Sequence, residues 1–268
     1  MERISIELTR RCGKACWFCY NGSDPAGATR WTPDEVVALV RDCARNGVRA
    51  VSFGGGEPLE YAGLFDVLAR LRGLVFRSLT SNGLLLDAET IARLVDVAID
   101  KVHLSIHFPG NTSEVARVIA GVLALRAAGV DAGVNLLVMR SSLPAARAAA
   151  AALHEAGIAN DRIVYLPMRG TDTPTPHELA SVAAAPFQSM TCLSACGPSP
   201  RFVSIRWDKT VAWCSYTATR HPLVALDHES LARATHGLGL EYCGGSDEGL
   251  VRLSRRAQHG HDMVRDRR

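Results

Sequence analysis

The sequence contains no long apolar run and has little net charge. No segment approaches the roughly 18 consecutive apolar residues of a membrane-spanning helix, and Met1-Glu2-Arg3 leads directly into a strand pattern without the apolar core of a signal peptide. We therefore expect no membrane association and a cytoplasmic location. The formal charge of +3 at pH 7 is too small by itself to indicate a nucleic-acid partner.

Cysteine is the exception in an otherwise ordinary composition, in which apolar residues make up 47% and charged residues 21%. The chain has eight cysteines. Without an export signal the thiols stay reduced, so metal or redox chemistry is a better explanation than disulfides. Cys43 is set apart because it continues the apolar helical stripe of Val36, Leu39 and Val40, where a thiol serves packing.

Short apolar runs alternate with segments of helical periodicity. This alternation predicts βα units around a parallel sheet, and six such units would close part of the way to an eight-unit barrel. The first helix begins at the Thr32 cap, with Pro33 and Glu35 completing its start, and ends at Asn46-Gly47. Further helices are expected at about 61–72, 87–97, 112–128 and 142–156. Strands are expected at 4–8, 50–53, 77–80, 101–107, 132–139 and 162–168.

The strand at 101–107 differs from the others because one of its faces is polar. Its apolar residues are Val102, Leu104 and Ile106, and its polar residues are Lys101, His103, Ser105 and His107. A parallel strand covered on both faces would be apolar throughout. The polar face therefore lines the barrel interior or, alternatively, the segment is an edge strand with one solvated face.

The pattern changes after residue 170, where we place a domain boundary. Residues 170–186 are interpreted as a connecting loop with at most one helical turn, and 201–214 as a hairpin around Asp208-Lys209. The predicted units are 1–170, 171–251 and a charged tail at 252–268. We interpret His259 and His261 in that tail as part of a solvated end rather than as a metal site.

Three cysteines follow the first strand at a spacing of C-x3-C-x2-C, namely Cys12, Cys16 and Cys19. Structural zinc takes four ligands, usually as two pairs. A [4Fe-4S] cluster held by three thiolates instead keeps one iron open to a substrate or cofactor. The missing fourth ligand is therefore a position at which another molecule can bind.

The stretch "CGKACWFC", with an aromatic residue before its last cysteine, resembles the motif of the radical S-adenosylmethionine (SAM) superfamily. A second match is "FGGGEP" at 53–58, which is similar to the family's Gly-Gly-Glu turn at the end of the second strand. The resemblance covers roughly residues 3–170. It implies an α/β fold with a partial (βα)6 barrel, and a [4Fe-4S] cluster held by Cys12, Cys16 and Cys19.

The resemblance also implies contacts to SAM. It places the amino group of the methionine moiety at Gly55, Gly56 and Glu57, the ribose or carboxylate at Ser81 and Asn82, the ribose at Ser105 and Asn135, and the adenine near Phe18 or Tyr20 and Leu166 of "YLPM". Taken singly, these residues also fit turn caps and polar strand positions. The implied reaction is reductive cleavage of SAM to a 5′-deoxyadenosyl radical, with an external one-electron reductant such as flavodoxin or ferredoxin.

The late cysteines resemble the front half of a twitch or SPASM appendage, whose pattern C-x9-15-G-x4-C binds an auxiliary [4Fe-4S] cluster. Here the spacing between Cys196 and Cys214 is x17, Lys209 stands at the glycine position, and the later C-x2-C is missing. A second cluster held by Cys192, Cys196 and Cys214 is expected. Cys243 is either its fourth ligand or a free thiol, and unrelated buried thiols remain an alternative.

The implied substrate is a small polyol or aminoglycoside-type natural product of antibiotic biosynthesis. Its inward-facing contacts are expected to be His103, His107, Tyr165 and Arg169. The first hypothesis is an epimerase in which Cys243 donates hydrogen, and the second is a dehydrogenase with the auxiliary cluster as electron acceptor. A peptide substrate ranks behind these because the chain has no room for a leader-binding domain before the barrel. An RNA methyltransferase fits the modest charge less well, and a metal-binding protein without catalysis is a further alternative.

Overall fold

The computed structural model describes residues 1–189 and 201–239. Its strands are β1 (Arg3–Thr9), β2 (Ala50–Gly55), β3 (Phe76–Ser81), β4 (Lys101–Ile106), β5 (Ala132–Val138), β6 (Ile163–Pro167), β7 (Gln188–Ser189), β8 (Phe202–Ile205), β9 (Thr210–Ala212) and β10 (His221–Pro222). Its helices are α1 (Pro33–Arg45), α2 (Leu64–Arg70), α3 (Ala88–Asp96), α4 (Thr112–Ala127), α5 (Leu143–Glu155), α6 (Pro176–Ala183) and α7 (His228–Thr235). Short 3-10 turns lie at η1 (Pro58–Glu60), η2 (Arg140–Ser142) and η3 (Asn160–Arg162).

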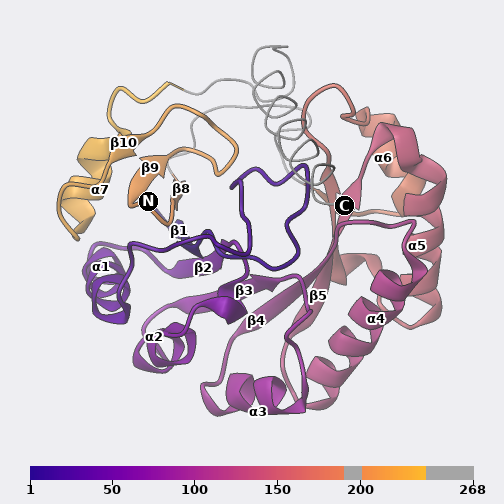
Figure 1. Cartoon of the computed structure of the whole chain (residues 1–268), viewed down its shortest axis with the longest axis horizontal. Helices are drawn as coiled ribbons and strands as arrows, with labels where there is room; N and C mark the ends of the chain where they lie inside the picture. Colours follow the sequence, from indigo (N-terminus) through magenta and orange to yellow (C-terminus); the bar gives the residue numbers. More distant parts are fainter. Residues whose placement is uncertain (190–200, 240–268) are drawn as a thin grey trace, which may run out of the picture.

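The strands form one sheet in the order β10-β9-β8-β1-β2-β3-β4-β5-β6-β7. Pairing is parallel from β8 through β1 to β7, and antiparallel between β8, β9 and β10. Figure 1 shows α1 to α6 on the outside of an arc of strands, with the indigo segment after β1 crossing the middle. The predicted partial (βα)6 barrel is confirmed. None of the helices in the described ranges is long and apolar enough to cross a membrane.

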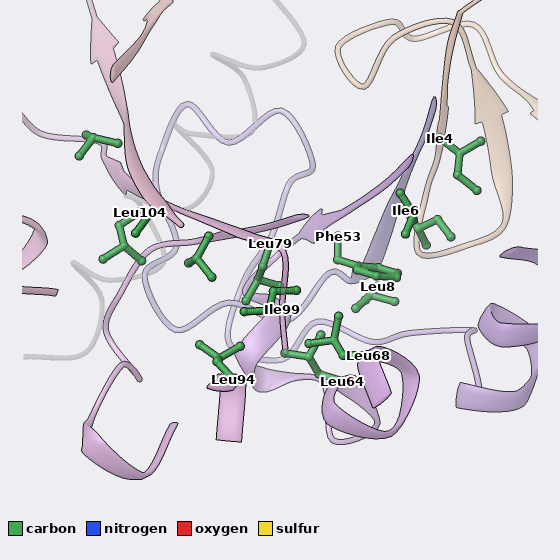
Figure 2. Packing of buried hydrophobic residues seen from close by; sticks show 14 of the residues in the cluster. Ile4, Ile6, Leu8, Phe53, Leu64, Leu68, Leu79, Leu94, Ile99 and Leu104 are labelled. Carbon is green, nitrogen blue, oxygen red and sulfur yellow. The ribbon is translucent and has the colours of Figure 1, made fainter. Parts of the chain in front are cut away.

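The hydrophobic core lies between the strands and the helices. In β1, Ile4, Ile6 and Leu8 have no exposed surface, and Figure 2 shows them in one layer with apolar residues of α2 and β3. Each such side chain contributes roughly 2 kcal/mol by its burial, so this outer layer stabilises the barrel. Because side chains alternate along a strand, Ser5 and Glu7 face the interior.

Helix α1 forms as its sequence predicts. Thr32 and Glu35 make the reciprocal hydrogen bonds of a capping box, Pro33 opens the helix, and Asn46 closes it. Cys43 has no exposed surface and belongs to the core, which confirms its packing role.

The prediction of a loop with at most one helical turn after residue 170 is wrong. Helix α6 occupies this segment, with its own capping box of Thr175 and Glu178 and with Pro176 in its first turn. The threonines and prolines that punctuate a loop also make a good helix start, and this signal is the same one that marks α1. Strand β7 then pairs with β6, so the sheet continues past residue 170, while the domain boundary there stays a prediction.

The predicted hairpin is confirmed as the antiparallel pair β8–β9. Lys209, at the position where the auxiliary-cluster motif has glycine, takes the left-handed φ of 66° that glycine favours. Strand β8 pairs in parallel with β1, so the hairpin extends the barrel sheet. Cys192, Cys196, Cys243 and the charged tail at 252–268 lie outside the described residues.

Candidate active site

The three cysteines lie on the loop that follows β1 and crosses the middle of the arc of strands (Figure 1). Cys12 is buried, whereas Cys16 and Cys19 are partly exposed. Burial raises the pKa of the Cys12 thiol and raises that of Cys16 to about 12. Within residues 1–189 and 201–239, no three His, Cys, Asp or Glu side chains already have the spacing of a metal site. A thiophilic metal would therefore displace protons as it draws the thiols together.

Two glycines let the end of β2 approach this loop. Gly55 has φ of 113°, and a Cβ on it would lie 2.7 Å from the Thr9 carbonyl oxygen. A Cβ on Gly56 would lie 2.1 Å from the Arg11 carbonyl oxygen. The Gly56 and Glu57 amides donate to these same two carbonyls, each at 2.7 Å. Only glycine fits this approach, so the turn and the cysteine loop form one rigid backbone unit.

Glu57 connects that unit to β3. Its side chain is buried; Oε1 accepts from Ser81 Oγ at 2.8 Å and Oε2 accepts from the Asn82 amide at 2.8 Å. The Asn82 side-chain nitrogen lies 3.6 Å from Cys12 Sγ. Burial raises the pKa of Glu57 to about 6 against the opposing effect of these hydrogen bonds. The structure thus brings together Cys12, Glu57, Ser81 and Asn82 from three segments of the sequence.

The other predicted cofactor contacts lie on the interior face of β4, β5 and β6. Ser105 pairs with Asn135, and Leu166 is on the next strand beside Leu137. Their neighbours in sequence, such as Leu104 and Leu136, are buried in the core. These three residues therefore face the same space as the Glu57 network, and their cofactor roles stay predictions.

A buried ion pair that sequence reasoning missed holds the cysteine loop to α4. Lys14 Nζ donates to Glu114 Oε1 at 2.7 Å and to His107 Nδ1 at 3.0 Å. The Lys14 and Glu114 side chains are only 10% and 4% exposed. Burial, reinforced by the Lys14 charge, lowers the pKa of His107 to about 4. His107 is thus neutral, and because Nδ1 accepts a hydrogen bond, its proton lies on Nε2.

Aromatic rings connect this ion pair to the last cysteine of the motif. The Phe18 ring lies 6.1 Å from the His107 ring and 5.5 Å from the Phe108 ring. Arg117 of α4 is nearby, since its charge also lowers the pKa of His107. Its Nε and Nη2 are buried without a hydrogen-bond partner in the structure. Such a guanidinium is a suitable partner for a carboxylate.

The structure places the predicted substrate contacts Tyr165 and His103 in different surroundings. The inward orientation of Tyr165 is wrong: its side chain is fully buried with Phe187, and its hydroxyl donates to Asn160 Oδ1 at 2.7 Å. His103 pairs with Gly133 near the amino ends of the strands. Burial, with the charges of Lys101 and Arg162, lowers its pKa to about 4. A substrate role for His103 stays a prediction.

The Arg169 guanidinium lies over the Tyr216 ring, which in turn packs against Tyr20 of the cysteine loop. The guanidinium lies 5.2 Å from the ring centre of Tyr216, and that ring lies 4.8 Å from Tyr20. Tyr216 follows Cys214 by two residues. The end of the hairpin, which carries one predicted ligand of the auxiliary cluster, therefore lies beside the motif cysteines.

Glu7 is a buried acid that sequence reasoning read only as part of a strand. Its side chain is 1% exposed, and Oε2 lies 3.7 Å from Arg206 Nε. The side-chain amide of Asn21 makes its best hydrogen bonds in the orientation in which its nitrogen donates to Glu7 Oε2 at 2.9 Å. Burial raises the pKa of Glu7 from 4.5 to about 7, against the charges of Arg220 and Arg206. A glutamate among buried apolar strand residues was the signal that could have identified it.

This raised pKa predicts how stability depends on pH. The fold favours protonated Glu7, so the contribution is fully present below pH 4.5 and is lost as the pH rises through about 7. The loss is about 3 kcal/mol of unfolding free energy. Urea unfolding of wild type and Glu7→Gln at pH 5 and pH 8 should show the wild type losing more stability at the higher pH. Equal losses would contradict the raised pKa, and Glu2→Gln is the exposed control.

A sequence model described as the Radical SAM superfamily matches residues 6–172. The match begins within β1 and contains β2 to β6, the three cysteines and the Gly-Gly-Glu turn. The chain therefore belongs to the radical SAM superfamily, and membership implies a [4Fe-4S] cluster and SAM as cofactors.

Curated relatives named as GTP 3′,8-cyclases are similar to part of the chain. "Probable GTP 3′,8-cyclase" of Thermococcus kodakarensis is 33% identical over 141 residues, which are 51% of this chain and 45% of that protein. "GTP 3′,8-cyclase 2" of Mycobacterium tuberculosis is 35% identical over 146 residues, which are 47% of this chain and 39% of that protein. The matches thus span less than half the length of these relatives.

Solved structures with the same fold cover more of the chain. SuiB of Streptococcus suis bound to S-adenosylmethionine has a TM-score of 0.68 at 14% identity, covering 88% of this chain and 66% of that one. Native anSMEcpe with bound AdoMet has a TM-score of 0.62 at 14% identity, covering 86% and 80%. At these identities the likeness shows the fold alone, which is the partial barrel.

Proposed function

We propose that the protein holds a [4Fe-4S] cluster through Cys12, Cys16 and Cys19, binds SAM beside it, and takes a hydrogen atom from a carbon of a small polyol or aminoglycoside-type substrate. The single observation that carries the proposal is the Glu57 network, which ties the Gly-Gly-Glu turn to Ser81, Asn82 and Cys12. When bound and reduced, the cluster and SAM supply a 5′-deoxyadenosyl radical, which is the cofactor's own chemistry.

The protein's contribution is to bind and orient the cofactor. Glu57 offers its carboxylate to the amino group of the methionine moiety of SAM. Arg117, whose Nε and Nη2 have no hydrogen-bond partner, offers its guanidinium to the carboxylate of that moiety. His107, neutral with its proton on Nε2, is a hydrogen-bond donor at the end of β4. The remaining contacts we assign are Ser105 and Asn135 at the ribose, and Phe18, Tyr20 and Leu166 on the adenine side.

The polar interior supports a hydroxyl-bearing substrate. Ser78 donates to Ser52 at 2.8 Å between β3 and β2, and Ser204 shares a hydrogen bond of 2.9 Å with Ser215. Such a lining suits alcohols better than apolar groups. A peptide is the second candidate, because anSMEcpe has been solved with bound AdoMet and the Cp18Cys peptide in a chain of the same fold.

Product analysis tests this function. The anaerobically reconstituted protein, reduced with dithionite, would be given SAM with carbon-deuterated polyols and aminoglycosides, with GTP, or with a short peptide. We expect 5′-deoxyadenosine that carries deuterium from a polyol. Deuterium transfer from GTP or from the peptide would show that the substrate is of that class instead of a polyol. A colourless protein that forms no 5′-deoxyadenosine would contradict the proposed function itself.

A second [4Fe-4S] cluster held by Cys192, Cys196 and Cys214 belongs to the same proposal. Two observations support it: Cys214 follows the hairpin beside the cysteine loop, and Lys209 takes the conformation of the motif's glycine. With this cluster fully ligated, the protein would be a dehydrogenase. With Cys243 free, it would be an epimerase in which the thiol gives a hydrogen atom to the substrate radical. The external reductant then returns one electron, and a proton restores the thiol.

Replacing Cys243 separates the two reactions. If the thiol is the donor, Cys243→Ala should keep about eight irons per chain and still form 5′-deoxyadenosine, while inverted product disappears. Wild-type product made in deuterated water should then carry one deuterium at the inverted carbon. Loss of iron would instead identify Cys243 as a cluster ligand. Normal product formation by the variant would contradict the donor role, and Cys43→Ala is the matched control.

A further inference from the structure

Glu7 is a buried acid on the interior face of β1, Arg220 is a half-buried base in the segment between β9 and β10, and each has one side-chain atom without a partner. Glu7 Oε1 and Arg220 Nη1 are both inaccessible to solvent and make no hydrogen bond in the structure. The charges of the two groups act on one another, since each shifts the pKa of the other. Above pH 7, where Glu7 is ionised, its Oε1 is an acceptor, while Arg220 Nη1 is a donor.

The remaining atoms of both groups are already engaged. Glu7 Oε2 faces Arg206 and the Asn21 amide, and Arg220 Nη2 donates to the Ser215 carbonyl oxygen at 2.7 Å. The Ser215 hydroxyl shares a hydrogen bond of 2.9 Å with Ser204 and also interacts with the Glu7 carboxyl, whose pKa it lowers. A buried polar atom without a partner costs free energy. Each of the two groups therefore still has a hydrogen bond to make.

This pair borders the cofactor site. Glu7 pairs with Gly54 on β2, and a Cβ on Gly55 would lie 2.9 Å from Glu7 Cα, so the acid adjoins the Gly-Gly-Glu turn. The Asn21 amide comes from the cysteine loop, and Arg220 comes from the segment that follows the hairpin. A substrate placed here would contact both halves of the chain.

We infer that Glu7 and Arg220 form a subsite for an alcohol group of the substrate, which donates to Glu7 Oε1 and accepts from Arg220 Nη1. This inference rests on the proposed function and specifies the chemistry of its substrate. A hydroxyl is the simplest group that donates and accepts at once. An ammonium would satisfy Glu7 but be repelled by Arg206 and Arg220, and a phosphate or carboxylate would be repelled by Glu7.

The test measures binding without turnover. The reconstituted holoenzyme with SAM and no reductant would be titrated, by saturation-transfer NMR, with myo-inositol up to 100 mM. Hexa-O-methyl-myo-inositol, which accepts but cannot donate, and inorganic phosphate are the comparison probes. We expect myo-inositol alone to bind, and to bind about tenfold more weakly or worse to Glu7→Gln and Arg220→Met. Glu2→Gln should match the wild type.

Several results would overturn the subsite. These are no binding of myo-inositol to the wild type, equal binding by the variants, or a crystal structure of the holoenzyme in which a water alone bridges the two atoms. Thermal unfolding distinguishes a substrate subsite from a purely structural role. If Glu7 serves only as an ion-pair partner, the Glu7→Gln variant should have a melting temperature far below that of the wild type. If Glu7 is a subsite residue, the melting temperature of this variant should be unchanged or raised.

The proposed function fails separately from the subsite. Formation of 5′-deoxyadenosine by the reduced wild type is scored in the same preparations. If it forms while the Glu7 and Arg220 variants bind myo-inositol normally, only the subsite is wrong. If none forms, the proposed function is wrong whatever the binding shows.

Discussion

Replacing Cys12, Cys16 and Cys19 together by alanine should abolish the cleavage of SAM to 5′-deoxyadenosine under dithionite. The reason is that three thiolates hold the cluster with one iron open, so no part of the site remains without them. Their absence should also strip the iron that they bind, and chromatography of the quenched reaction measures the loss of product directly.

Cys43→Ala provides the matched control for that variant. Cys43 is equally a free thiol, but it is buried in the core on α1 and far in sequence from the loop. Its replacement should leave iron content and cofactor cleavage at wild-type levels. A triple variant that still cleaves SAM would show that the cluster assignment is wrong.

Glu57→Ala should weaken SAM binding by about 100-fold or more, because a charge-assisted hydrogen bond and the shape of the turn are lost together. The side chain organises the site before any cofactor binds, accepting from Ser81, Asn82 and the Leu59 amide. Removing it leaves those buried donors unpaired. Glu57→Gln should destabilise the fold less than Glu57→Ala does, since burial already disfavours the charge. It should still bind SAM poorly.

Equilibrium binding of radiolabelled SAM to the unreduced protein measures this effect independently of turnover. Iron content should stay at the wild-type level because the three cysteines remain. Glu89→Gln, on the exposed face of α3, is the control for loss of a surface carboxylate. Wild-type affinity in Glu57→Ala would contradict the role of the turn.

Signals that act over a few neighbouring residues were enough to predict the scaffold from the sequence. The capping residues of α1, the alternation of short apolar runs with helical segments, and the cysteine spacing all act over a few residues, so the sequence predicts them directly. The Gly-Gly-Glu turn was found in the same way, by its place after the second strand. Even the missed helix α6 carried its signal locally, in Thr175 and Glu178.

Contacts between distant segments were decided only by the tertiary structure. Lys14 meets His107 and Glu114 across 93 and 100 residues, and Arg206 meets Glu7 across most of the chain. No spacing rule predicts such pairs, because they depend on which strands become neighbours. The partnership of β8 with β1, which brings the hairpin to the barrel, is of the same kind.

The sequence alone also could not predict which way individual residues of a strand face. Tyr165 lies in a strand with apolar residues on both faces, so alternation could not show that its ring packs against Phe187 instead of facing the interior. In β1, by contrast, Ile4, Ile6 and Leu8 fix the core face and leave Glu7 inside. The sequence by itself determined the barrel and the cysteine loop, whose signals are local. Only the tertiary structure decided which polar residues meet around that loop, because that depends on strand order and on the face each residue takes.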